Sequence, residues 1–216
     1  NRHGVIHVGG AGTVCLDANL WGIKELPERG RLVQIPKFSI SLGGPAAAGL
    51  SVIQALGAST HFFGPLGSDE AGDAILSLLN ARGIDTSGVL RLSGEVSSSG
   101  SGVLVYQDGE RSFLHAPGTN GLLTDESIDE EALSQMDAFL LAGLGILPGL
   151  DGKSMGWLMA KAKGQRVVTA VDTADGGRGL GEAIELLMPS LRFVDYLFVS
   201  EAEHQQFTGK TDPLSS

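Results

Sequence analysis

The chain has 216 residues, enough for one or two domains with a substantial buried core. Hydrophobic residues make up 42% and charged residues 19%, which excludes an intrinsically disordered chain. Fifteen basic residues against 25 acidic ones give a net charge of −10, so neither nucleic acid nor an anionic membrane is an expected partner. A single cysteine, Cys15, excludes an intrachain disulfide and a four-cysteine zinc site. With no apolar signal segment at its start, the chain is expected to be cytoplasmic.

Strand and helix patterns alternate over the first part of the chain. Pro45 suits the first position of a helix and Gly57 suits the residue after one, so they bracket a helix of small residues. Ser68 and Asp69 precede a run with apolar residues on one helical face, which predicts a second helix. The elements predicted here are strands at 5–8, 13–16 and 31–35, a helix at 46–56, a strand at 60–63 and a helix beginning at 67–69.

Residues 88–116 differ from the alternating part of the chain. Three short strands are predicted there, at 89–92, 102–106 and 112–115. Asp108-Gly109 between the last two is a typical hairpin turn. This block therefore predicts a small antiparallel sheet.

The alternation of helices and strands returns after residue 116. Such a pattern predicts an α/β protein with a parallel sheet and helices on both faces. Ligands in such folds bind beside the carboxyl ends of the strands. The predicted elements are helices at 125–134, 154–163, 181–187 and 201–207, and strands at 138–141, 166–172 and 196–199.

Two glycine-rich segments suggest nucleotide sites, and each departs from its pattern. Gly10-Ala11-Gly12 follows a strand, but Cys15 stands where a dinucleotide-binding fingerprint has its third glycine. Gly152-Lys153-Ser154 is similar to the end of a P-loop, but Leu147 stands where that motif has its first glycine. A P-loop hydrolase that uses Lys153 stays open as an alternative, and an NAD site is disfavoured.

Four segments follow one another in the chain: LGGPAAA at 42–48, ALGA at 55–58, FGPLGSDEAG at 63–72 and LNARGID at 79–85. In this order they resemble the N-terminal signature of ribokinase-like (PfkB-type) carbohydrate kinases. Asp17 resembles the sugar-binding aspartate of that family, and residues 196–209 resemble its "NxxE … LTG" segment. The resemblance implies a three-layer α/β/α, Rossmann-like core with a small antiparallel β lid, in one domain over residues 1–216. It places the lid strands within 13–40 and 88–116.

The same resemblance implies ATP-dependent phosphorylation of a hydroxymethyl group on a small sugar or sugar acid. The implied cofactors are ATP and Mg²⁺, with a monovalent cation as a further candidate. The acidic Asp17 can accept hydrogen bonds from two sugar hydroxyls, and Gly43 and Gly44 let backbone N–H groups approach a ligand. The residues implied for the substrate are Asp17, Gly43, Gly44, Ala48, Asn120 and Arg178, and those for the cofactor are Ser200 and Glu203, with Glu203 toward the metal.

Three departures from the family pattern keep other functions open. Ala48 and Ser200 stand where the family usually has asparagine. The family's "GAGD" segment, which carries the catalytic base, has no counterpart in residues 1–216, so the domain is expected to be C-terminally incomplete. The alternatives are a catalytically inactive sugar-binding homologue, a nucleoside kinase of the same family and an α/β scaffold whose glycines serve only turns. A homodimer through the β lid is a further expectation.

Overall fold

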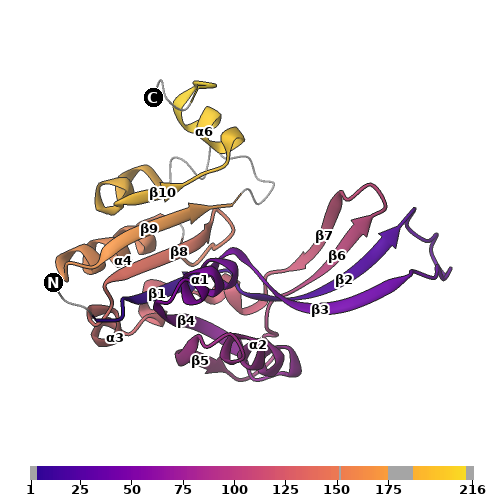
Figure 1. Ribbon diagram of the computed structural model, residues 1–216, viewed down its shortest axis with the longest axis horizontal. Coiled ribbons are helices and arrows are strands. Elements are labelled where there is room, and N and C mark those ends of the chain that lie inside the picture. The colour runs from indigo at the N-terminus through magenta and orange to yellow at the C-terminus, as the bar shows by residue number, and fades with distance from the viewer. Residues whose placement is uncertain (1–3, 151, 175–186, 213–216) are drawn as a thin grey trace.

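Two sheets organise the protein (Figure 1). The computed structural model describes residues 4–150, 152–174 and 187–212. The large sheet has six strands in the order β10-β9-β8-β1-β4-β5, and every neighbouring pair is parallel. Its strands are β1 (His7–Gly12), β4 (Ser59–Gly67), β5 (Asp85–Leu92), β8 (Ala138–Leu144), β9 (Val168–Thr173) and β10 (Tyr196–Phe198).

Helices pack on both faces of the large sheet, as the alternating pattern predicts. In β8, Phe139 and Leu141 join a core cluster with residues of α4, whereas Leu140 and Ala142 join a second cluster with residues of α1 and α2. Successive side chains of a strand point to opposite faces, so these two clusters are the two sides of the sheet. The three-layer α/β/α architecture is confirmed. The helices are α1 (Pro45–Ala55), α2 (Glu70–Asn80), α3 (Glu130–Ser134), α4 (Lys153–Gly164) and α6 (Glu201–Thr208).

The small sheet projects from the large one as an arm (Figure 1). Its order is β3-β2-β6-β7, with β2 (Cys15–Ile23), β3 (Lys37–Gly43), β6 (Gly100–Tyr106) and β7 (Arg111–Ala116). The pair β2–β6 is parallel, so the sheet is mixed and the purely antiparallel expectation is wrong. Both strands start at the base of the arm, where the Leu16 N–H donates to the Ser99 carbonyl at 3.1 Å, and they run outward together.

Residues 89–92 belong to the large sheet and not to the small one, which corrects the prediction for 88–116. They form the end of β5, whose partner is β4 in parallel register from Phe63↔Gly88 to Gly67↔Leu92. Gly88 leaves room for the Phe63 ring, because a Cβ atom at Gly88 would overlap that ring. Local sequence shows that a strand forms, but not which sheet it joins.

Two other predicted elements differ from the structure, and a third lies almost wholly outside the described residues. No strand forms at 31–35, where the chain is irregular and largely exposed. The helix predicted at 125–134 is two pieces, a 3₁₀ turn (η2, Asp125–Ser127) and α3, each with its own N-cap. The helix predicted at 181–187 lies outside the described residues except for Leu187. The remaining predicted elements form, with shifted ends. No helix within the described ranges is long and apolar enough to cross a membrane.

Candidate active site

The Asp17 carboxylate lies against Gly43 at the base of the arm. Cys15 and Gly43 are register partners in β2 and β3, and Asp17 is two residues further along the same face. A Cβ atom at Gly43 would overlap the Asp17 carboxylate, so only glycine leaves this space free. Asp17 and Gly43, which the sequence assigned to one sugar site, are therefore in contact.

The Cys15 thiol donates a hydrogen bond to Asp17 Oδ1 at 3.2 Å. Burial, followed by the negative charge of Asp17, raises the pKa of the thiol to about 12. The thiol therefore stays protonated at neutral pH and acts as a hydrogen-bond donor that orients Asp17. Only the thiolate form of cysteine is a strong nucleophile, so Cys15 is not expected to react as one.

A row of polar residues crosses all four strands of the arm at the level of Asp17. Register places Ser41, Asp17, Ser101 and His115 side by side on one face. The Ser101 hydroxyl and His115 Nδ1 are 3.0 Å apart, and Asn19 on the same face donates to Ser41 Oγ at 2.9 Å. This face offers alternating hydroxyl, carboxylate and imidazole groups, which suit a ligand rich in hydroxyls.

Sequence analysis missed Ser41, Ser101 and His115 as candidate site residues. Serine and histidine are common in exposed strands, and nothing local to them points to a ligand. Only the register of β6 and β7 against β2 brings Ser101 and His115 beside Asp17. The strand alternation in residues 15–19 was the one available signal, because it places Cys15, Asp17 and Asn19 on one face.

Gly44 forms the N-cap of α1 beside this row. Its backbone has φ 93° and ψ 143°, and it supplies no side-chain cap. A Cβ atom there would overlap the Thr13 carbonyl, which also accepts the Ala46 N–H at 3.2 Å. The helix N-terminus is thereby held close to the chain that joins β1 to β2, and its positive end lies at the base of the arm.

Asn120 and Ala48 are placed differently from each other. Asn120 is 3% exposed, and its carboxamide donates to the Val14 carbonyl at 3.0 Å and accepts the Val14 N–H at 3.4 Å. It therefore fixes the start of β2 next to Asp17. Ala48 is exposed on α1 and lines an apolar cavity of about 680 Å³ between α1 and strands β8 to β10.

Two carboxylates lie near the carboxyl end of β9. Burial, followed by the charge of Glu203, raises the pKa of Asp172, and a hydrogen bond from the Gly143 backbone opposes that shift. Glu203 is 5% exposed and accepts the Ser200 N–H at 2.6 Å, while its own N–H donates to Ser200 Oγ at 3.2 Å. Ser200 and Glu203 thus form a capping box at the start of α6, which sequence analysis did not foresee. Arg178 lies outside the described residues.

The geometry around Lys153 does not favour a P-loop. Leu147 and Leu150 are fully buried in the core, so the segment after β8 directs side chains inward instead of wrapping a phosphate. The Ser154 hydroxyl, which would bind magnesium in a P-loop, pairs with Asp125.

Asp69, in the segment that resembles the family's "GxxGxDxxG" loop, anchors that loop to residues before β6. Its carboxylate accepts the Gly72 N–H at 2.9 Å, the Ser98 N–H at 2.8 Å and the Ser98 hydroxyl at 2.6 Å. Burial alone would raise the pKa of Asp69, but the bonds from Ser98 and Gly72 outweigh it and the pKa is lowered. The ionised carboxylate therefore stabilises the fold.

Asp69→Asn is expected to lower the free energy of unfolding at pH 7 by about 1–2 kcal/mol, because the amide loses the charge that strengthens the bonds from Ser98 and Gly72. A lowered pKa makes the contribution of Asp69 complete above its unfolded pKa of about 3.9 and lost as pH falls through the lower folded pKa. Urea unfolding from pH 7 down to pH 3 measures the gap between wild type and variant, which should shrink below about pH 4. The exposed Asp73→Asn, which breaks only a surface pair with Arg91, is the control. A gap that is independent of pH would contradict this account.

Comparison with known proteins identifies the family of the chain. Residues 12–215 match the family described as pfkB family carbohydrate kinase. The chain is 28% identical over 156 residues to an uncharacterized sugar kinase of Archaeoglobus fulgidus, covering 66% of this chain and 58% of that protein. It is 29% identical over 118 residues to fructokinase-1 of Zea mays, covering 54% of this chain and 36% of that protein. The chain thus spans a little more than half of the first relative and about a third of the second.

Solved structures share the fold. An Arabidopsis thaliana ribokinase complexed with ribose and ATP matches with a TM-score of 0.75 at 22% identity, over 95% of this chain and 63% of that one. A Xylella fastidiosa fructokinase with bound ATP matches with a TM-score of 0.73 at 20% identity, over 94% of this chain and 64% of that one. The family match extends over almost all of residues 1–216, so the chain belongs to the pfkB family of carbohydrate kinases.

Proposed function

We propose that this protein serves the ATP-dependent phosphorylation of a hydroxymethyl group on a small sugar or sugar acid. The observation that carries the proposal is the Asp17 carboxylate, held against Gly43 in a row of polar residues beside the N-terminus of α1. Relatives named as a sugar kinase and a fructokinase support a sugar as the substrate. Neighbours solved with ribose and ATP support the pair of ligands.

The sugar would bind at the base of the arm. Oδ1 of Asp17 is engaged by the Cys15 thiol, which orients the carboxylate toward two hydroxyls of the ligand. Ser101 and His115 lie in the same row and can complete the hydrogen bonds of the sugar ring. The arm would cover the bound sugar and exclude water from the reacting hydroxyl.

Asp172 and Glu203 fit a site for Mg²⁺. Burial first, and then the negative charge of Glu203, raises the pKa of Asp172, so the two carboxylates lie close enough to interact. Carboxylate oxygens are ligands that Mg²⁺ prefers. When bound with ATP, the ion would neutralise charge on the phosphates. Glu203 keeps Oε1 outside the capping bond, because the Ser200 N–H donates to Oε2.

Mg²⁺ at about 10 mM is expected to raise the melting temperature of the wild-type protein, since an ion that binds only the folded state stabilises it. When neither sample contains Mg²⁺, Asp172→Asn should melt at a higher temperature than wild type, because one of two repelling charges is gone. The same variant should respond little to Mg²⁺. Differential scanning fluorimetry with and without EDTA measures both effects. The control is Asp137→Asn, at an exposed carboxylate just before the start of β8. An equal Mg²⁺ response of wild type and Asp172→Asn would remove Asp172 from the metal site.

Sugar binding without phosphoryl transfer is the second candidate function. It is favoured by Ala48 and Ser200, which stand where the family usually has asparagine. Calorimetry with sugars, paired with an assay for sugar-dependent ADP release from ATP and Mg²⁺, separates the two. Binding with turnover supports the kinase, and binding without turnover supports the second function.

We also propose that the apolar face of the arm pairs two copies of the chain. Ile40 and Leu114 lie in one row on the face opposite Asp17, and they are 47% and 70% exposed. Phe38 on the same face is 60% exposed. An exposed apolar sheet face of this kind is typical of an interaction surface.

Ile40→Asp is expected to convert a dimer of the wild-type chain into a monomer, because a buried unpaired charge at the centre of the interface is costly. Sedimentation velocity measures the change. Leu122→Asp, at a residue 48% exposed in η1 (Gly118–Leu122), is the matched control and should leave the dimer intact. The proposal would be contradicted if the wild-type chain sediments as a monomer, or if the Ile40→Asp variant still sediments as a dimer.

A further inference from the structure

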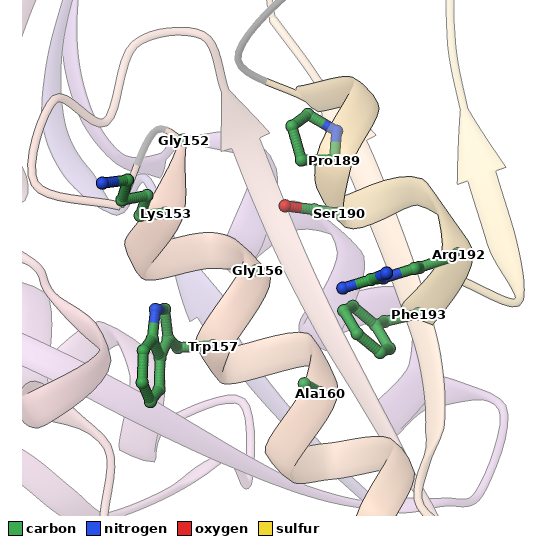
Figure 2. Close-up of a pocket in the computed structure, with 9 residues that line it drawn as sticks. All are labelled: Gly152, Lys153, Gly156, Trp157, Ala160, Pro189, Ser190, Arg192 and Phe193. Carbon is green, nitrogen blue, oxygen red and sulfur yellow. The ribbon is translucent and has the colours of Figure 1, made fainter.

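A second cavity lies between α4 and the 3₁₀ helix η3 (Met188–Phe193), and it shares no lining residue with the candidate active site. Its volume is about 480 Å³, and it is called here the α4–η3 groove. Figure 2 shows its lining residues on the two facing helices. Gly152, Lys153, Gly156, Trp157 and Ala160 come from α4 and its cap, and Pro189, Ser190, Arg192 and Phe193 come from η3.

The Ser190 hydroxyl lines this groove without a hydrogen-bond partner. Ser190 is 1% exposed, and its Oγ has no partner among the described residues. In Figure 2 the hydroxyl points from η3 toward α4. Gly156 on α4 leaves the facing space open, since a Cβ atom there would lie 2.9 Å from Ser190 Oγ. A buried hydroxyl without a partner is costly, and a ligand that accepts a hydrogen bond from it would remove that cost.

Among the described residues, the charged groups that line the groove are both positive. Lys153 contributes an ammonium and Arg192 a guanidinium, and none of the described acidic residues lines the cavity. Neither cation has an acidic side chain within 4.0 Å in the described ranges, whereas Lys161 and Lys163 further along α4 pair with Glu130 and Asp195. The N-cap of α4 is Gly152, which supplies no side-chain oxygen to the positive end of the helix. In a chain of net charge −10, this local concentration of positive charge suits an anion.

The remaining lining is flat and apolar. Trp157 is 65% exposed, and the Arg192 guanidinium lies 4.6 Å from the centre of the Phe193 ring. Stacking on the ring holds the guanidinium in place, and Figure 2 shows its end directed toward α4. An aromatic or similarly flat group could pack between Trp157 and Pro189 while its anionic group meets Arg192 and Ser190.

We propose that the α4–η3 groove binds a small aromatic oxyanion, either a carboxylate or a phosphate ester. Its anionic oxygens accept hydrogen bonds from Arg192 and Ser190, and Lys153 adds positive charge at the mouth. This site is independent of the sugar site and of the reaction proposed there.

Trp157 provides the readout, because the chain has two tryptophans and Trp21→Phe leaves Trp157 as the only one. The probes are benzoate and phenyl phosphate, with benzyl alcohol and inorganic phosphate as partial mimics. At least one aromatic anion should change the Trp157 fluorescence saturably, with the mimics at least about tenfold weaker. Arg192→Gln should weaken binding about tenfold or more. Gly156→Val should abolish it by filling the groove.

Matched controls locate the site. Two variants should leave the affinity unchanged. Gly164→Val changes a glycine of the same helix with open space around it, and Arg82→Gln changes an exposed arginine just after the C-terminal end of α2. Asp17→Asn should also leave it unchanged. The proposal is overturned if neither aromatic anion binds saturably, if Arg192→Gln binds as tightly as wild type, or if benzyl alcohol or inorganic phosphate binds equally well. Circular dichroism shows whether Gly156→Val is folded, and the Arg192→Gln result decides the question if it is not.

Discussion

Asp17→Asn is expected to lower the affinity for the sugar by about a hundredfold or more, because two hydrogen bonds to a charged group are each worth about 1.5–3 kcal/mol. The amide keeps the shape of the carboxylate but replaces one acceptor with a donor, which faces a sugar hydroxyl or the Cys15 thiol. Titration calorimetry with the preferred sugar measures the loss.

The matched control for Asp17→Asn is Asp73→Asn, at an exposed carboxylate on α2. It carries the same change of charge and should leave sugar affinity unchanged. If Asp17→Asn binds sugar within about twofold of wild type, the loss is far smaller than two charged hydrogen bonds would give, and Asp17 is not part of the site.

Gly44→Ala is expected to lower the free energy of unfolding by about 3 kcal/mol or more. The backbone at φ 93° and ψ 143° is strained by about 1–3 kcal/mol for any residue other than glycine. In addition, the new methyl group would overlap the Thr13 carbonyl, so α1 must move away from the chain between β1 and β2. Urea unfolding measures the cost, and sugar affinity should fall together with stability.

Gly57→Ala separates the two causes of that loss. Gly57 has φ 98° but open space around its Cα, so alanine there meets backbone strain without overlap. The difference between the two variants reports the contact with Thr13. Equal losses at both positions would show that Gly44 is needed only for its backbone conformation.

Local signals predicted α1 and α2 well, missed the break between η2 and α3, and predicted the pairing of strands poorly. Pro45 and Gly57 bracket α1, and Asp69 caps α2, because capping depends on residues next to the helix. Which sheet a strand joins depends on residues far away in the chain. Residues 89–92 read as a strand in either sheet, and only their register with β4 decides.

The candidate site was predicted in the same uneven way. The family resemblance brought Asp17 and Gly43 together, and the structure places them in contact. Ser101 and His115 were missed because β2 and β6 are paired across more than 80 residues, as Asp17↔Ser101 shows. Glu203 has two compatible uses, since a Ser-x-x-Glu pattern forms a capping box whether or not the carboxylate also binds a metal.

The most direct test of the central claim is a melting-temperature screen of the wild-type protein against hexoses, pentoses, sugar acids and nucleosides. Ligands that bind only the folded state raise its melting temperature. This account predicts that a sugar or sugar acid raises it and that the Asp17→Asn variant does not respond to the same compound. No response to any sugar, or a response to nucleosides alone, would contradict it.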